Sequence, residues 1–139
     1  MVNMLTPALA FPFLMNRHLT VLHRCLGPRE PALLLAACVL AERPRSRFSF
    51  ASLILLSRRR LIVTSEYGLC RNLRLYLNVD LRQLSDVAWS ADPGRGGLRL
   101  AVTAVDGVRE HFWIKLGSAE RIGRIDALLR DLFDRTNGR

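Results

Sequence analysis

The sequence predicts a mainly β protein of the α+β class, with seven antiparallel strands between one helix at each end of the chain. The clearest sign is residues 53–66, where two apolar runs are joined by a turn of three arginines, Arg58, Arg59 and Arg60, as in a β-hairpin. Alternating apolar and polar residues follow it, and residues 122–133 carry an apolar stripe at helical spacing. With 139 residues, the chain is long enough for a single domain around one hydrophobic core.

The first element is expected to be a helix that begins near Pro12, because proline fits the first turn of a helix but interrupts its interior. Gly27 and Pro28 should end this helix, since glycine is common just after a helix and proline cannot continue one. The helix needs an apolar surface to lie on, because it carries an apolar stripe made of Met15, Leu19, Leu22 and Leu26.

The seven predicted strands cover residues 31–40, 48–56, 61–65, 73–79, 84–89, 98–102 and 108–114. The first is a continuous apolar run that would also suit a buried helix. We expect a strand because a polar loop containing Pro44 follows it and strand patterns begin directly afterwards. In the last strand, Phe112 and Ile114 should lie on one face, with His111 and Trp113 on the other.

The chain is expected to end in a hairpin and a helix. Asp106 and Gly107 predict a two-residue turn between the last two strands. Ser118 can cap the helix that follows. The helix should bury one apolar stripe, which consists of Ile122, Ile125, Leu128, Leu129, Leu132 and Phe133.

Charge is distributed unevenly along the chain. The formal net charge is +9, and residues 1–75 hold 11 arginines against 3 acidic residues, whereas residues 76–139 hold 10 basic and 9 acidic residues. The abundance of arginine is also typical of a bacterial genome rich in G and C, so it is weak evidence by itself. Its concentration in the first half indicates an acidic protein surface, an anionic membrane or a nucleic acid as the partner.

The cysteines and the N-terminus predict a cytoplasmic protein. Cys25, Cys38 and Cys70 are odd in number and widely spaced, which favours neither a zinc site nor a redox pair. We therefore expect reduced thiols and no metal. Residues 1–16 lack charge but contain two prolines and no basic region, so we expect neither a signal peptide nor a transmembrane helix.

The order of these elements resembles the pleckstrin-homology (PH) superfold, and the resemblance is closest to bacterial PH-like domains. It rests on three segments: Leu-Leu-Ser-Arg-Arg-Arg-Leu-Ile-Val at 55–63, Val-Asp-Leu-Arg-Gln-Leu-Ser-Asp-Val-Ala-Trp at 79–89, and Gly-Pro-Arg-Glu-Pro-Ala-Leu at 27–33. The resemblance implies a PH-like domain over residues 27–139, preceded by an N-terminal apolar segment and helix over residues 1–26. It also implies a seven-stranded barrel whose end is capped by the C-terminal helix, with no catalytic site and no cofactor.

An arginine-rich loop is the first candidate site. The resemblance implies anion or lipid binding by the loop between the first two strands, where Arg43, Arg45 and Arg47 alternate. In an up-and-down meander the loop between strands 3 and 4 lies at the same end, which adds Arg71 and Arg74. The alternative is a solvated, arginine-rich surface. The arginine turn at 58–60 lies at the other end, where we expect it to shape the hairpin and protect it from aggregation.

An apolar cluster near the N-terminus is the second candidate site. Phe11, Phe13, Leu14 and Met15 could insert into a membrane or dock in a groove of a partner. The alternative is that they pack on their own domain or on a second copy of the chain.

These observations favour a non-catalytic binding or adaptor module that engages a protein partner, with the cytoplasmic membrane surface as a further place of action. The alternative is a peripheral module that binds anionic lipid directly through Arg43, Arg45 and Arg47. Nucleic acid is disfavoured because aromatic residues make up only 7% of the chain and no nucleic-acid-binding signature is present. No small-molecule substrate is indicated, because the histidines have no nucleophile or acid at a diagnostic spacing.

Overall fold

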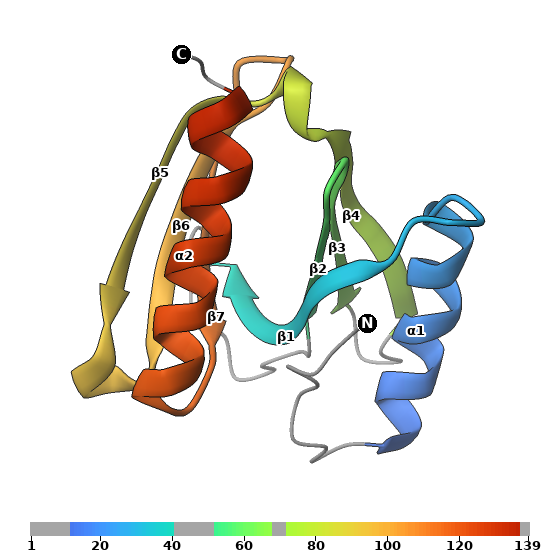
Figure 1. Ribbon diagram of the computed structural model, residues 1–139. Coiled ribbons are helices and arrows are strands. Elements are labelled where there is room, and N and C mark those ends of the chain that lie inside the picture. Colours follow the sequence, from blue (N-terminus) through green and yellow to red (C-terminus); the bar gives the residue numbers. More distant parts are fainter. Residues whose placement is uncertain (1–11, 41–51, 68–71, 137–139) are drawn as a thin grey trace.

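The structure, a computed structural model, describes residues 12–40, 52–67 and 72–136. Seven strands form one antiparallel sheet in the order β4-β3-β2-β1-β7-β6-β5 (Figure 1). The elements are α1 (Pro12–Cys25), β1 (Ala32–Leu40), β2 (Ser52–Ser57), β3 (Arg60–Tyr67), β4 (Asn72–Asp80), the 3-10 turn η1 (Leu81–Gln83), β5 (Ser85–Asp92), the 3-10 turn η2 (Pro93–Arg95), β6 (Gly97–Thr103), β7 (Arg109–Lys115) and α2 (Ala119–Thr136). The mainly β class and the two predicted helices are confirmed.

Strand β1 joins two halves of the sheet. It pairs with β2 from Ala32 to Cys38 and with β7 from Cys38 to Leu40. Figure 1 shows β1 curving between the β2–β4 half and the β5–β7 half, so that the two halves face each other like the sides of a V. Helix α2 lies along the β5–β7 half on the side that faces the other half.

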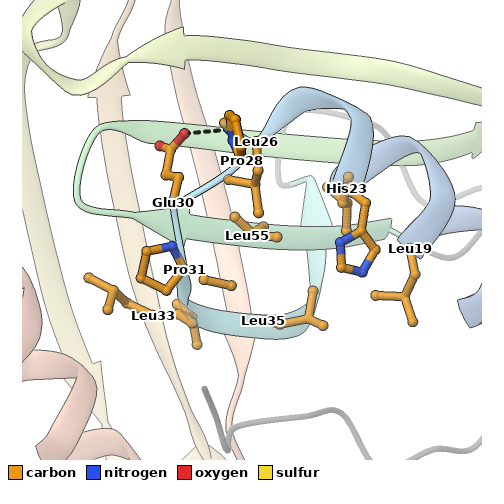
Figure 2. A pocket seen from close by; sticks show the side chains of 13 residues that line it. Leu19, His23, Leu26, Pro28, Glu30, Pro31, Leu33, Leu35 and Leu55 are labelled. Carbon is orange, nitrogen blue, oxygen red and sulfur yellow. Dashed lines mark hydrogen bonds between the residues drawn. The ribbon is translucent and has the colours of Figure 1, made fainter. Parts of the chain in front are cut away.

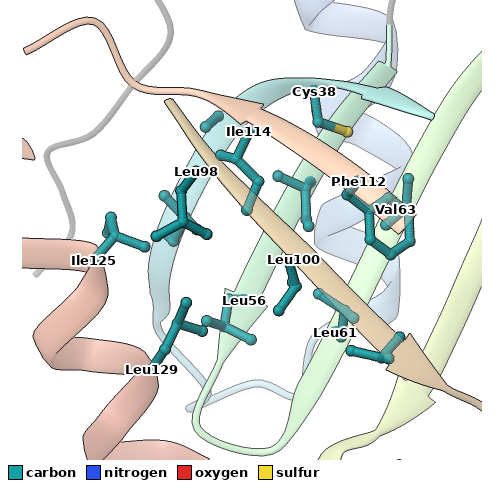
Figure 3. Packing of buried hydrophobic residues seen from close by; sticks show 14 of the residues in the cluster. Cys38, Leu56, Leu61, Val63, Leu98, Leu100, Phe112, Ile114, Ile125 and Leu129 are labelled. Carbon is teal, nitrogen blue, oxygen red and sulfur yellow. The ribbon is translucent and has the colours of Figure 1, made fainter. Parts of the chain in front are cut away.

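The main core fills the space between the two halves and α2 (Figure 3). Alternation along each strand supplies its side chains, because successive residues point to opposite faces of a sheet. In β7, Phe112 and Ile114 are buried while His111 is exposed, as predicted. The predicted apolar stripe of α2 is buried here through Ile122, Ile125, Leu129, Leu132 and Phe133.

A second, smaller core lies on the outer face of the β2–β4 half, under α1. Leu22 of α1 is fully buried there, where it packs with Leu53 and Leu55 of β2 and Ile62 of β3. This is the apolar surface that the stripe of the first helix needed. The main core covers one face of β2 and the smaller core under α1 covers the other, so every residue of β2 is buried.

The predicted closed barrel is wrong. β4 and β5 are the two edges of the sheet and do not pair with each other. η1 connects them, and Leu81 and Leu84 on either side of this connection turn into the main core instead. Helix α2 therefore packs between the two halves of an open sheet rather than capping a barrel. The hydroxyl of Tyr76 on β4 donates to Glu110 Oε1 on β7 at 2.8 Å, which bridges the halves.

The predicted two-residue turn between β6 and β7 is also wrong. The backbone N–H of Gly107 donates to Ala104 O at 2.9 Å, and the N–H of Ala104 donates to Val108 O at 3.1 Å, so residues 105–107 form a three-residue loop. A two-residue type I′ turn would need positive φ at both central residues. Gly107 has φ +85°, but the φ of Asp106 is not positive.

Candidate binding groove

Most of the predicted site residues lie outside the described part of the chain. Phe11, Arg43, Arg45, Arg47 and Arg71 are outside it, and so are the side chains of Phe13, Leu14 and Met15 near the start of α1. Their roles remain predictions.

Arg74 is the one predicted anion-binding residue whose side chain is described. It is exposed on β4 and pairs with Ser65 of β3, which in turn pairs with Ser52 of β2. Ser52 pairs with Cys38 near the end of β1. Arg74 therefore lies at the end of the sheet where β1 leads into residues 41–51, and the arginine turn between β2 and β3 lies at the opposite end.

An apolar groove lies at that opposite end, between α1 and the outer face of β1 and β2 (Figure 2). Leu35 of β1 and Leu55 of β2 are cross-strand partners, so their side chains stand together on the outer face. Leu19 and Leu26 approach them from the helix side. The groove has a volume of about 510 Å³ and is open to solvent along one side.

A second hollow, with a volume of about 420 Å³, continues this groove toward the β2–β3 turn. The two hollows share Gly27, Pro28, Glu30 and Pro31. The lining of the second hollow is basic, because it includes Arg29, Arg58 and Arg59. The molecule thus has one continuous groove with an apolar part and a basic part.

Glu30 ties the corner after α1 to the β2–β3 turn. Its Oε1 accepts a hydrogen bond from the backbone N–H of Gly27 at 2.8 Å, and its Oε2 accepts one from the hydroxyl of Ser57. Ser57 Oγ in turn accepts from the backbone N–H groups of Arg59 at 3.1 Å and Arg60 at 3.0 Å. These bonds hold the walls of the groove in fixed positions.

The electrostatics of Glu30 follow from these contacts. Burial opposes ionisation of its carboxyl group, but the hydrogen bonds from Ser57 and Gly27, together with the nearby charge of Arg60, hold the pKa of Glu30 below its ordinary value. The Arg60 guanidinium lies 3.6 Å from Glu30 Oε1. Glu30 is therefore ionised at neutral pH and committed to the structure of the corner.

A buried polar cluster lies beside the groove, under the same helix. Nε2 of His18 on α1 lies 3.1 Å from Oε2 of Glu66, and its Nδ1 lies 2.6 Å from Oγ1 of Thr64, both on β3. All three residues are at most 1% exposed. Burial lowers the pKa of His18, and Arg17 adds to this, against the opposing effect of Glu66. The neutral ring then donates from Nε2 to the carboxylate and accepts the hydroxyl proton of Thr64 at Nδ1.

This cluster has the hydroxyl–imidazole–carboxylate order of a hydrolytic triad, but its geometry suits packing. Thr64 is 0% exposed, so its hydroxyl cannot meet a substrate. Glu66 Oε1 is buried and accepts no hydrogen bond within the described ranges. The cluster therefore supplies polar contacts that fix where α1 lies on the sheet.

The other candidate groups have ordinary settings. Cys38 is buried in the main core, and burial raises the pKa of its thiol to about 12, so it behaves as a small apolar side chain. The described part of the chain contains no group of three or more metal-ligating side chains. None of its helices combines the length and the hydrophobicity that crossing a membrane requires.

Comparisons with known proteins do not assign the chain to a family. No model of a known protein family matches the sequence, and a search of curated proteins found no match.

Sequence reasoning did not find the groove. The sequence places Leu35 and Leu55 only within predicted strands, and Arg58 and Arg59 only in a predicted turn. The available signal was that the apolar run 53–56 needs cover on both faces, since a strand with one exposed face would alternate. That requirement pointed to the first helix as the second cover.

Proposed function

We propose that the protein is a non-catalytic binding module that engages a protein partner through the groove between α1 and β1. The observation that carries this proposal is the open apolar groove of about 510 Å³. Apolar surface that stays accessible in a folded chain marks a site of interaction. A groove open along one side suits a segment of another protein, because small-molecule sites bury most of their ligand.

The architecture supports a scaffold of the PH-like type. Seven antiparallel strands followed by a C-terminal helix fit the element order of that family, although the sheet is open. We further propose that the protein acts in the cytoplasm, since its described cysteines, Cys25 and Cys38, are free and free thiols are typical of a reducing compartment.

Leu19→Glu is expected to abolish partner binding. The substitution places a carboxylate in the apolar part of the groove, where a docked apolar side chain would leave it without water. Affinity purification of the tagged protein from its native host should recover a partner with the wild type, and at least about tenfold less of it with the variant.

Val105→Glu is the matched control, because Val105 is an apolar residue that is 71% exposed in the β6–β7 loop, away from the groove. It should recover the partner as the wild type does. Circular dichroism must show that both variants remain folded. Equal recovery with a folded Leu19→Glu protein would refute the groove as the docking site.

The lipid-binding alternative is supported by the position of Arg74, which is exposed at the end of the sheet where residues 41–51 connect β1 and β2. In this case the wild-type protein should sediment with vesicles that contain anionic lipid, and added salt should weaken the binding. Replacing Arg43, Arg45 and Arg47 together by glutamine should abolish sedimentation. Absence of sedimentation at physiological salt would remove this alternative.

A further inference from the structure

The basic part of the groove contains more positive charge than the neighbouring carboxylates neutralise. Four arginines lie around it, namely Arg29, Arg58, Arg59 and Arg60, against the three carboxylates of Glu30, Asp80 and Asp131. Arg60 is paired with Glu30, which is itself held by Gly27 and Ser57. Arg58 lies 3.8 Å from Asp131, with both side chains about half exposed, and such a pair contributes little.

Within the described ranges, Arg29 and Arg59 form no close ion pair or side-chain hydrogen bond, and Arg59 acts on the carboxylates of Glu30 and Asp80 only through its charge. Their backbone positions are nevertheless fixed. The N–H of Arg59 is bonded to Ser57, and Arg29 lies between Pro28 and Glu30 in the corner that Glu30 closes. Arg29 and Arg59 thus line a hollow of about 420 Å³ that shares Gly27, Pro28, Glu30 and Pro31 with the apolar part of the groove.

We propose that the groove selects a partner segment in which an apolar side chain stands next to carboxylates. The apolar side chain fills the hollow formed by Leu19, Leu35 and Leu55, and the carboxylates pair with Arg29 and Arg59. This inference rests on the proposed function and names the chemistry of the partner. A carboxylate held at the edge of an apolar hollow is partly removed from water, which strengthens its charge-assisted hydrogen bonds to arginine.

Other occupants fit less well. Within the described part of the chain, no Phe, Tyr or Trp lines either hollow and His23 is the one aromatic ring, so nucleic-acid bases would find little surface to stack on. A second copy of the chain carries the same net charge of +9. Four acidic side chains of the described part are already engaged by neighbouring arginines, in the pairs Asp80–Arg82, Asp92–Arg95, Glu120–Arg124 and Asp126–Arg130.

Selection from a display library of random peptides tests the inference, with the full-length protein as bait and its Leu19→Glu variant for counter-selection. Enriched peptides should combine a leucine, isoleucine, phenylalanine or methionine with a neighbouring aspartate or glutamate. One such peptide is then synthesised with a fluorophore and titrated by anisotropy. The double variant Arg29→Gln/Arg59→Gln should weaken its binding by roughly tenfold or more, and added salt should weaken wild-type binding.

The double variant Arg99→Gln/Arg124→Gln removes the same charge from exposed positions on β6 and α2 and should leave the affinity nearly unchanged. Enriched peptides without acidic residues, bound equally by the Arg29→Gln/Arg59→Gln protein, would overturn this inference and leave the proposed function standing. If no peptide is enriched over Leu19→Glu, both fail. Dimerisation that Leu19→Glu abolishes would overturn the inference in favour of a second copy.

Discussion

Replacing His18 by leucine is expected to lower the free energy of unfolding by about 3–5 kcal/mol. The imidazole is the one hydrogen-bond partner of the Glu66 carboxylate among the described contacts, and Glu66 Oε1 already has none. Removing the ring therefore leaves a carboxylate that is 1% exposed without compensation. Equilibrium urea unfolding, followed by circular dichroism, measures the loss.

The triple variant His18→Leu/Thr64→Val/Glu66→Leu separates the cost of a broken pair from the value of the cluster. An apolar replacement of a whole buried polar group is often neutral or stabilising, so the triple variant should regain most of the loss. Both results together would show that the cluster positions α1 rather than stabilising the protein. A single variant as stable as the wild type would show that Glu66 is not buried under α1 as described.

The same cluster predicts how stability depends on pH. Burial lowers the pKa of His18 in the folded protein, so the folded state binds fewer protons at this site than the unfolded chain does. The contribution of His18 is thus complete above the unfolded pKa of about 6.5 and is lost as the pH falls below it. Urea unfolding at several pH values should show this decline in the wild type and a smaller one in His18→Leu.

Local patterns were enough to predict the strands and helices. Strand β7 shows why: Phe112 and Ile114 are apolar and buried, His111 between them is polar and exposed, and a period of two leaves little choice of conformation. Helix α2 is similar, since Ser118 Oγ accepts from the N–H of Arg121 at 3.2 Å, as a capping residue should.

Pairing between distant strands could not be predicted in this way. Whether the sheet closes depends on how β4 and β5 meet, and Leu81 and Leu84 decide it by turning into the core at their connection. The buried cluster depends on contacts between His18 and residues 46 and 48 positions away in the sequence. No spacing rule reaches across such a distance, because the contact exists only after α1 has docked.

The groove could be predicted from the sequence only in part. The continuous apolar run of β2 and the amphipathic first helix together implied that α1 covers the outer face of the sheet. They did not imply that the cover is incomplete. Leu35 stays partly exposed beside the helix, because α1 packs mainly over β3 and β4 rather than over β1.

Phe112→Ala is expected to lower the free energy of unfolding by about 3–5 kcal/mol. Phe112 is 1% exposed and pairs with Leu40 of β1 on one side and Leu100 of β6 on the other. It therefore fills the main core at the place where β1 passes from one half of the sheet to the other (Figure 3). Truncation leaves a cavity bounded by two sheet halves, which cannot collapse without moving one against the other.

Phe112→Leu keeps most of the volume and should cost roughly 1.5 kcal/mol or less, whereas Val105→Ala, at a position that is 71% exposed, should stay within about 0.5 kcal/mol of the wild type. Because β2 and β3 contribute to both cores, the fluorescence of the two tryptophans, Trp89 and Trp113, and the circular dichroism signal should change at the same urea concentration in every variant. Two separate transitions, or a loss below about 1 kcal/mol in Phe112→Ala, would mean that the two halves of the sheet do not share one core.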